Sequence, residues 1–297
     1  ARTSGAGLFV FRYRDPMAPI RWHLRDRVVE FGKRPLAMGI VNVTPDSFSD
    51  GGRFLDTDAA VAHATKLLAE GADLFDVGGE STRPGATPVA VQDEIDRVLP
   101  VIRRLAGGAA PISVDTMKPA VARLALAAGA SIVNDVAGFR DPAMIRVAAE
   151  HRAAVIVMHM QGTPQTMQTA PTYHDVVREV GDFFEERLRV LGESGIPAEA
   201  VCLDPGIGFG KTLDHNLELL ANLDAFARFG RPVCLGVSRK GLIGALCGRE
   251  KSERMAGSLA VACIVAARRA AHVLRVHDVA ETRDAAVLLD AIDRHRR

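Results

Sequence analysis

Eight short apolar runs, rich in β-branched residues, alternate with longer amphipathic segments along this 297-residue chain. Runs that are apolar on both faces are typical of strands buried in a parallel sheet. The amphipathic segments have the apolar spacing of helices that cover such a sheet. The predicted strands span residues 36–41, 73–77, 112–115, 131–134, 153–158, 201–204, 232–237 and 273–276. The predicted helices span residues 59–70, 94–105, 119–128, 142–150, 174–192, 215–226, 253–269 and 280–295.

This alternation predicts an α/β fold with a single domain over residues 36–297. Eight strand–helix units in about 250 residues suit a (β/α)8 TIM barrel. An open doubly wound sheet is the alternative, because a count of repeats does not show that the sheet closes. Residues 1–35 contain several arginines and Trp22, the one tryptophan of the chain. We expect them to form an N-terminal extension across the bottom of the barrel.

Charge and composition exclude several classes of partner. The chain carries 37 basic and 36 acidic residues, and because a nucleic-acid-binding domain usually has a basic excess, we expect no nucleic-acid partner. The apolar run at 256–267 is shorter than the ~20 residues of a membrane span, and the run at 8–11 is too short for a signal-peptide core. The four cysteines form no CxxC pair, which argues against a zinc site and a disulfide framework. We therefore expect no membrane partner, reduced thiols and a cytoplasmic location.

Polar side chains follow every predicted strand. Because the carboxyl ends of barrel strands open on one face, these side chains should share one mouth. A charged or amide group there is costly to bury unless it is paired or binds a ligand. The segments read NVTPDSFSDGG from residue 42, DVGGESTRPG from 76, SVDT from 113, ND from 134, MHMQGTP from 158, DPGIGFGK from 204, GVSRKG from 236 and RVHD from 275. The pattern predicts a ligand site at the carboxyl ends of the strands.

The glycine-rich segment after the sixth strand resembles a phosphate loop but lacks its spacing. A P-loop needs glycine where Pro205 stands, and the dinucleotide pattern needs glycine where Lys211 stands. We therefore interpret Gly206, Gly208 and Gly210 as a turn that lets the backbone approach a flat ligand.

Several acidic residues have simpler structural explanations. Asp115 could cap the helix that follows it, whereas Asp204 precedes a proline and a long loop, so capping explains it poorly. We expect Asp76, Asp135 and Glu80 to brace neighbouring loops rather than to bind a ligand.

The loops after the first two strands, residues 44–52 and 78–88, are long and carry glycine and proline. Connections in α/β units usually take about 2–6 residues, and longer ones after barrel strands commonly act as lids. We expect both loops to close over the site. We expect His159, after the fifth strand, to line the wall rather than to act as a ligand.

The eight segments, in this order, resemble the motifs of the dihydropteroate synthase family from residue 36 to residue 292. The resemblance implies a barrel that joins 6-hydroxymethyl-7,8-dihydropterin diphosphate to 4-aminobenzoate in folate biosynthesis. The products would be 7,8-dihydropteroate and diphosphate, and the cofactor would be Mg²⁺. The resemblance also implies a sulfonamide target and a homodimer, for which the apolar segment 257–267 could supply the interface.

The family's functional positions match residues of this chain one by one. By that resemblance the pterin-binding residues are Asp115, Asn134, Asp204, Lys240 and Arg275. The diphosphate-binding residues are Asn42, Arg275 and His277, and the Mg²⁺ ligand is Asn42. The aminobenzoate-binding residues are Phe48, Thr82, Arg83, Pro84, Phe209, Ser238 and Lys240. The catalytic residues are Arg275, His277, Asn42, Lys240, Asp50 and Arg83.

The reaction expected from these residues is dissociative, with loss of diphosphate before attack by the arylamine. The pterin ring can share positive charge on its exocyclic methylene, so the main task is to neutralise the leaving diphosphate. An arylamine is neutral near pH 7, so no strong base is required. Ser238 is expected to begin a helix whose amides face the benzoate carboxylate. Two rivals are a non-catalytic pterin-binding homologue, disfavoured by the intact lid motifs, and a pterin-dependent methyltransferase, disfavoured by the RVHD and SRK segments.

Overall fold

The computed structural model describes residues 20–32, 34–44 and 53–295. Its main sheet has eight parallel strands in the order β8-β7-β6-β5-β4-β3-β10-β9. These strands are β3 (Leu36–Asn42), β4 (Leu74–Gly78), β5 (Ile112–Asp115), β6 (Ile132–Asp135), β7 (Ala154–Met158), β8 (Val201–Asp204), β9 (Cys234–Leu235) and β10 (Val273–Val276). Each predicted strand is present, and the predicted α/β class is confirmed.

The sheet closes between β8 and β9, the two ends of this order. Leu203 forms a parallel bridge with Val233, and its amide donates to the carbonyl oxygen of Pro232 at 2.9 Å. The structure is therefore the predicted (β/α)8 barrel, and the open-sheet alternative is wrong. Strand β9 is shorter than predicted. Pro232 has no amide proton to give to a ladder, and the Val233 amide is taken by the His272 ring at 3.1 Å.

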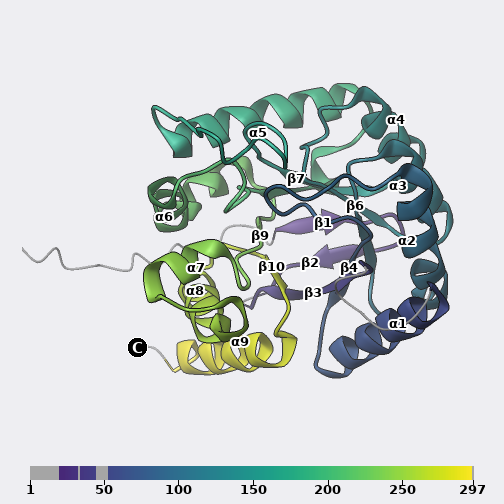
Figure 1. Ribbon diagram of the computed structural model, residues 1–297. Coiled ribbons are helices and arrows are strands. Elements are labelled where there is room, and N and C mark those ends of the chain that lie inside the picture. Colours follow the sequence, from purple (N-terminus) through teal and green to yellow (C-terminus); the bar gives the residue numbers. More distant parts are fainter. Residues whose placement is uncertain (1–19, 33, 45–52, 296–297) are drawn as a thin grey trace, which may run out of the picture.

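Helices surround the strands on the outside of the barrel (Figure 1). They are α1 (Arg53–Ala69), α2 (Val91–Leu105), α3 (Pro119–Ala127), α4 (Pro142–Glu150), α5 (Val176–Glu193), α6 (Leu213–Ala221), α7 (Gly241–Cys247), α8 (Met255–Ala267) and α9 (Val279–Asp293). Short 3-10 turns cover Ala198–Ala200, Leu223–Phe229 and Lys251–Glu253. The sequence pattern predicted one helix over 253–269, whereas a separate short helix, α7, precedes α8. Within the described ranges, no helix is long and apolar enough to cross a membrane.

Side chains along the barrel strands alternate between two apolar clusters. The larger cluster contains residues such as Val77 and Leu274, which pack against the helices. The smaller cluster lies toward the amino-terminal ends of the strands and contains Met38, Leu74, Ile132, Ile156, Cys202, Cys234 and Val273 together with Trp22. Because successive strand residues point to opposite faces, the residue two positions further along each strand lies above this second cluster. Those positions define the mouth described below.

A small hairpin covers the amino-terminal end of the barrel. Its strands are β1 (Arg21–His23) and β2 (Val28–Glu30), paired antiparallel. Trp22 is fully buried, packs in the lower cluster, and donates its indole N–H to the Ala200 carbonyl oxygen at 2.9 Å. The hairpin therefore lies across the bottom, although the domain boundary at residue 35 stays a prediction.

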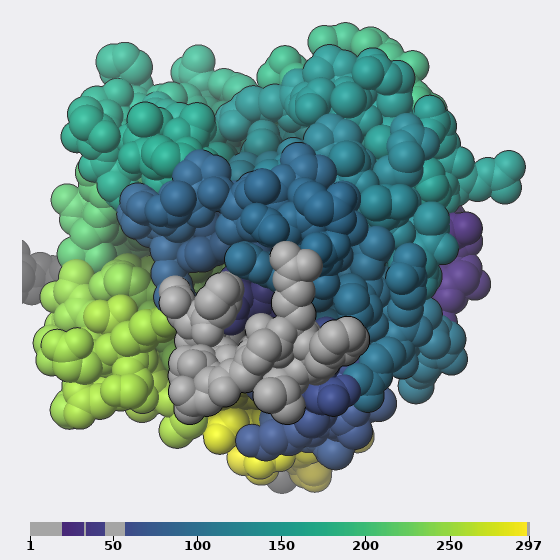
Figure 2. All heavy atoms as spheres, turned by 45° about the vertical axis from the view of Figure 1, so that its right-hand side comes forward, coloured from purple at the N-terminus to yellow at the C-terminus, as the bar shows by residue number. Residues whose placement is uncertain are grey.

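The first and last helices of the barrel meet on the outside, as a closed ring requires. The yellow C-terminal helix lies next to the blue α1 segment at the lower edge of Figure 2. The side chain of Arg283 in α9 packs directly against Gly71, which follows α1. Gly71 has a φ of +94°, and any side chain there would collide with this arginine.

Candidate active site

The centre of the mouth is a buried network of four side chains from four strands. Arg275 on β10 donates from Nε to Asp76 Oδ2 at 2.5 Å and from Nη2 to Asp115 Oδ2 at 2.8 Å. Asn134 on β6 donates from Nδ2 to the same oxygen of Asp76 at 3.0 Å. The predicted residues Asp115, Asn134 and Arg275 are thus brought together, although Asp115 and Arg275 are 160 residues apart in the sequence.

Two carboxylates share one guanidinium in this network, and the pKa of Asp115 is raised. Burial and repulsion from Asp76 raise it to about 7, with Arg275 opposing the rise. Burial disfavours the charge on Arg275 as well, but Asp76 and Asp115 outweigh it and raise the arginine pKa. Asp76 Oδ1 and Asp115 Oδ1 have no hydrogen-bond partner within the described part of the chain. Buried acceptors without donors are costly, so the network is suited to receive N–H groups from a ligand.

Asp204, at the end of β8, and Lys240, in the turn between β9 and α7, form the second part of the mouth. Asp204 is buried, and its Oδ1 accepts from the Gly206 amide at 2.7 Å. Lys240 Nζ donates to the Ile207 carbonyl oxygen and lies 4.6 Å from the centre of the Phe209 ring. Burial lowers the pKa of Lys240 to about 8, with Asp204 opposing the fall. Burial likewise raises the pKa of Asp204, with Lys240 opposing the rise.

His277 lies beside this mouth as a neutral imidazole at pH 7. Burial and the charges of Arg275 and Arg239 lower its pKa to about 4. Its backbone amide donates to Ser238 Oγ at 3.2 Å, and its Nδ1 is 3.0 Å from the same hydroxyl. The hydroxyl can donate to Nδ1, and in that tautomer Nε2 carries the ring proton and serves as a donor.

The helix expected to begin at Ser238 begins later. Helix α7 starts at Gly241, with Lys240 in the N-cap position. Arg239 intervenes with a φ of +57° and is fixed by an ion pair with Asp278 that includes Nε to Oδ2 at 3.1 Å. The turn at residues 238–240 therefore delays the helix and directs the Ser238 hydroxyl to His277.

The remaining predicted residues lie around the rim. Asn42 is half-buried at the end of β3, in register with Gly78 of β4. On the loop after β4, Thr82 is half-buried, whereas Arg83 and Pro84 are exposed and lie outside the buried network. Phe48 and Asp50 lie outside the described residues.

The loop after β4 contacts other rim segments. The Gly85 amide donates to the Pro164 carbonyl oxygen of the loop after β7 at 3.4 Å. Arg83 lies close enough to Lys251 for its charge to contribute, after burial, to lowering the pKa of that lysine. The loop after β4 thus lies next to both the loop after β7 and the α7–α8 connection.

Sequence reasoning missed Asp76 as a member of the site. The expectation that it braces a loop is wrong, because its carboxylate lies inside the barrel between Arg275 and Asn134. The signal was its position two residues after the inward-facing Leu74. The expectation for Asp135 is confirmed, since it accepts from the amides of Ala137 and Phe139.

Two more expectations concern Glu80, as a loop brace, and His159, as a wall residue. Glu80 is confirmed as a brace, because it accepts from the Val89 amide at 2.7 Å and from Lys118 Nζ at 2.9 Å. His159 is buried, and its ring packs edge-on against Phe183 with centroids 5.0 Å apart. Lys211, which sequence reasoning considered only as a mismatch to a motif, is 2% exposed.

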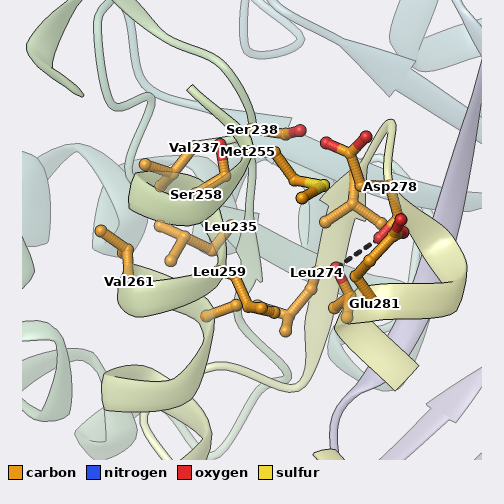
Figure 3. Close-up of a pocket in the computed structure, with 13 residues that line it drawn as sticks. Leu235, Val237, Ser238, Met255, Ser258, Leu259, Val261, Leu274, Asp278 and Glu281 are labelled. Carbon is orange, nitrogen blue, oxygen red and sulfur yellow. Dashed lines mark hydrogen bonds between the residues drawn. The ribbon is translucent and has the colours of Figure 1, made fainter. Parts of the chain in front are cut away.

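A second hollow lies between β9, β10, α8 and α9 (Figure 3) and reaches Ser238 at its edge. Its lining includes Leu235, Met255, Leu259 and Leu274, with Ser238 and Asp278 toward one end. Its volume is about 20 Å³, which is room for a water molecule, whereas small-molecule sites usually measure about 300–1,000 Å³. This hollow is therefore too small for a small-molecule ligand, and it is the convergent buried polar groups that make the mouth the candidate site.

Comparison with known proteins gives the same family throughout. The family model described as pterin binding enzyme matches residues 38–277. The dihydropteroate synthase of Escherichia coli (strain K12) is 49% identical over 258 residues, which cover 86% of this chain and 91% of that protein.

Solved structures agree with the sequence matches. A dihydropteroate synthase from Xanthomonas albilineans in complex with 7,8-dihydropteroate has a TM-score of 0.82 and 47% identity, covering 92% of this chain and 98% of its own. A Yersinia pestis dihydropteroate synthase in complex with a sulfonamide drug has a TM-score of 0.86 and 42% identity. The match covers 92% of this chain and 99% of that one.

Proposed function

This chain belongs to the pterin binding enzyme family, among its dihydropteroate synthases, and from that premise we infer how its site performs the reaction. The chain is a transferase of folate biosynthesis. It condenses 6-hydroxymethyl-7,8-dihydropterin diphosphate with 4-aminobenzoate, giving 7,8-dihydropteroate and diphosphate. The observation that carries the residue assignments is the convergence of buried acids with Arg275 at one mouth of the barrel.

The pterin is held by the floor of the mouth. The aminopyrimidine edge of a pterin presents adjacent N–H donors, which the free oxygens of Asp115 and of Asp204 can accept. Asn134 adds an amide, and Lys240 exchanges its bond to the Ile207 carbonyl for one to the ring carbonyl or a ring nitrogen. Arg275 offers a planar guanidinium that can stack on the flat heterocycle.

The leaving diphosphate lies between Arg275, His277 and Asn42. Arg275 stays charged at all relevant pH values, because Asp76 and Asp115 raise its pKa. His277 is neutral and donates from Nε2, so it can bind a phosphate oxygen without first being protonated. These donors stabilise charge that grows as the C–O bond breaks, which favours departure of diphosphate before attack by the arylamine.

The residues present fit a Mg²⁺ ion shared with the substrate. Asn42 offers a hard amide oxygen at a half-buried position, and Mg²⁺ in phosphate sites usually takes only one or two protein oxygens. Asn42 would hold the ion, which would neutralise diphosphate charge when bound.

The aminobenzoate site is formed by the rim. Phe209 and the stem of Lys240 offer an apolar surface for the aromatic ring, and Ser238 lies at the edge of the same opening. Thr82, Arg83 and Pro84 lie on the loop after β4, which closes over the ring, and Phe48 is assigned to the same site by the family motif. Closure excludes water, which would otherwise capture the pterin cation as the alcohol. Asp50 is assigned to the catalytic residues by the family motif that assigns Phe48.

A sulfonamide competes with 4-aminobenzoate for this rim site. Support comes from the related Yersinia pestis enzyme, whose structure holds a sulfonamide drug. We expect sulfonamide inhibition of this chain to be relieved by added 4-aminobenzoate, and inhibition that 4-aminobenzoate does not relieve would contradict the assignment.

The enzyme acts as a cytoplasmic homodimer. Support for the dimer comes from apolar side chains exposed on α8, where Met255 is 40% and Ile264 is 48% exposed. Support for a reducing compartment comes from the buried free thiols of Cys202 and Cys234. Light scattering should give twice the 31.8 kDa chain mass, and Ile264→Glu should shift it toward the monomer. Cell fractionation tests the location.

The reaction itself is tested by incubating the chain with the pterin diphosphate, 4-aminobenzoate and Mg²⁺. We expect dihydropteroate by mass detection together with released diphosphate. Pterin binding without diphosphate release would indicate the non-catalytic homologue instead, and methyl transfer from a pterin would indicate the methyltransferase.

A further inference from the structure

The loop after β8, residues 205–211, lies with its backbone directly on the loop after β7. Gly206, Gly208 and Gly210 have φ values of +67°, +84° and +60°, a backbone conformation that residues other than glycine rarely adopt. A Cβ atom on Gly206 would lie 1.9 Å from the His159 carbonyl oxygen, and one on Gly210 would lie 2.5 Å from that of Gln161. The glycines thus permit a close approach that other interactions must hold in place.

Lys211 supplies the central interaction at this approach. Its Nζ donates to the carbonyl oxygens of Gly206 and Phe209, both at 3.0 Å, and contacts His159 Nδ1 at 3.0 Å. With the His159 carbonyl oxygen at 3.3 Å, four acceptors surround an ammonium group that has three protons to donate. Burial lowers the pKa of Lys211 to about 7, with Asp204 opposing the fall. Removing such a donor leaves several buried acceptors unsatisfied, which is more costly than losing an exposed bond.

His159 is suited to receive this bond. Burial and the charge of Lys211 lower its pKa to about 2, so the ring is neutral and Nδ1 accepts. Its backbone amide donates to the Asp204 carbonyl oxygen at 2.9 Å. His159 and Lys211 therefore join the carboxyl ends of β7 and β8.

Side chains bind every carbonyl oxygen from residue 206 to residue 210. Besides the two bound by Lys211, Gly208 accepts from Gln168 Nε2 at 2.8 Å, and Gly210 accepts from the Tyr173 hydroxyl at 2.8 Å. The fifth, Ile207, accepts from Lys240. Lys240 is assigned to substrate above, so the loop must keep its shape when that bond is exchanged.

We propose that Lys211 is a positioning residue for the synthase reaction, whose buried amine ties the 205–211 loop to His159 and thereby holds Phe209 under Lys240. The proposal rests on the assignment of Phe209 to the aminobenzoate site made above. Lys211 touches no substrate in this account and acts through the backbone of the loop. It therefore affects 4-aminobenzoate more than the pterin, whose acids are carried by the strands themselves.

The test compares Lys211→Met with two reference variants. Phe209→Ala removes the aromatic ring that Lys211 positions. Trp22→Phe removes one buried hydrogen bond at the opposite end of the barrel and serves as the control for a general loss of stability. For each variant, KM for both substrates and kcat are measured, together with amide hydrogen exchange of the 205–212 peptide.

We expect Lys211→Met to raise KM for 4-aminobenzoate about tenfold, which is the effect of reducing the competent loop population to about one tenth. KM for the pterin diphosphate should change by about twofold at most on the same reasoning. Exchange at the Gly208 and Phe209 amides should accelerate. Trp22→Phe should lower the melting temperature and leave both KM values unchanged. If Lys211→Met does not fold, His159→Phe keeps an aromatic ring but removes the acceptor, and should shift the same KM in the same direction.

The outcomes separate the two ideas. Unchanged exchange at 206–210 in Lys211→Met would overturn the positioning role whatever the kinetics. An unchanged aminobenzoate KM would also overturn it, provided that Phe209→Ala raises that KM. If Phe209→Ala leaves that KM unchanged, the aminobenzoate assignment itself is wrong. If Trp22→Phe raises KM for 4-aminobenzoate as much as Lys211→Met does, the effect of Lys211→Met is explained by a general loss of stability. That result would overturn the proposal.

Discussion

Replacing Asp76 by asparagine should shift the acidic limit of pterin binding to lower pH. In the present structure the pKa of Asp115 is raised from 3.8 to about 7, by burial first and by the charge of Asp76 second. Asparagine keeps the oxygen that accepts from Arg275 and Asn134, and its nitrogen replaces Asp76 Oδ1, which is unpartnered among the described residues. Asp76→Asn thus removes one negative charge while keeping the shape of the network.

The magnitude follows from the pKa shift. Removing a like charge that shares one guanidinium should lower the pKa of Asp115 by about 1 to 2 units, or about 1.4 to 2.8 kcal/mol. If the ionised Asp115 accepts from the pterin, wild-type affinity falls as the pH drops through about 7, and the variant should retain affinity to about pH 5 to 6. Lys240, with a pKa of about 8, sets the alkaline limit in both.

The same shift predicts the pH dependence of stability. Because the folded pKa of Asp115 lies above its unfolded value, the folded protein keeps a proton that the unfolded chain has already released. Stability should therefore fall as pH rises from about 4 to about 7, by at most about 4 kcal/mol from this group. In Asp76→Asn the fall over this window should be smaller by about 1 to 3 kcal/mol.

The assay is calorimetric titration with the pterin diphosphate between pH 5 and pH 9, with urea unfolding at pH 5 and pH 8. The substrate titrates in the same way in both experiments, so its contribution cancels when wild type and Asp76→Asn are compared. Asp73→Asn is the matched control, because Asp73 precedes the same strand and pairs with Arg34 at the other end of the barrel. An acidic limit at the same pH in wild type and Asp76→Asn would refute the reasoning.

Three further substitutions test other parts of the account. Arg275→Ala should lower kcat for diphosphate release by about 10² to 10³, and near-normal turnover at saturating substrate would remove the arginine from its assigned role. Asp204→Ala should abolish calorimetric pterin binding while circular dichroism stays native, because the acceptor for the pterin edge is lost. Trp22→Ala should lower the free energy of unfolding by about 3–5 kcal/mol in urea, and a loss below about 1 kcal/mol would show that the hairpin does not stabilise the barrel floor.

The barrel was predictable because its signal is repeated in every unit of the chain. Runs such as residues 154–158 are buried on both faces, and only a parallel sheet covered by helices accommodates eight of them. Boundaries were less predictable where local chemistry competes with the pattern. Pro232 cannot donate to the ladder and shortens β9, and the Arg239 turn places α7 after Lys240 rather than at Ser238.

Within the site, Asp115, Asn134, Asp204 and Arg275 were found through the family motifs, whereas Asp76 was interpreted as a loop support. Asp76 lies in the middle of β4, so it looked like a loop support until the side-chain alternation placed it inward with Arg275. Lys211 was hidden for a different reason, since its partners are backbone carbonyls and one histidine. Sequence patterns carry little information about acceptors that every residue possesses.

The central claim is that the buried acids of the mouth bind the pterin while the neighbouring Arg275 stabilises the leaving diphosphate. A crystal structure with the pterin diphosphate bound tests this claim most directly. We expect the aminopyrimidine edge to lie within hydrogen-bond distance of Asp115 and Asp204, with phosphate oxygens bound by Arg275 and His277. A ligand bound at the hairpin end of the barrel, or a pterin turned with its phosphates toward Asp204, would contradict it.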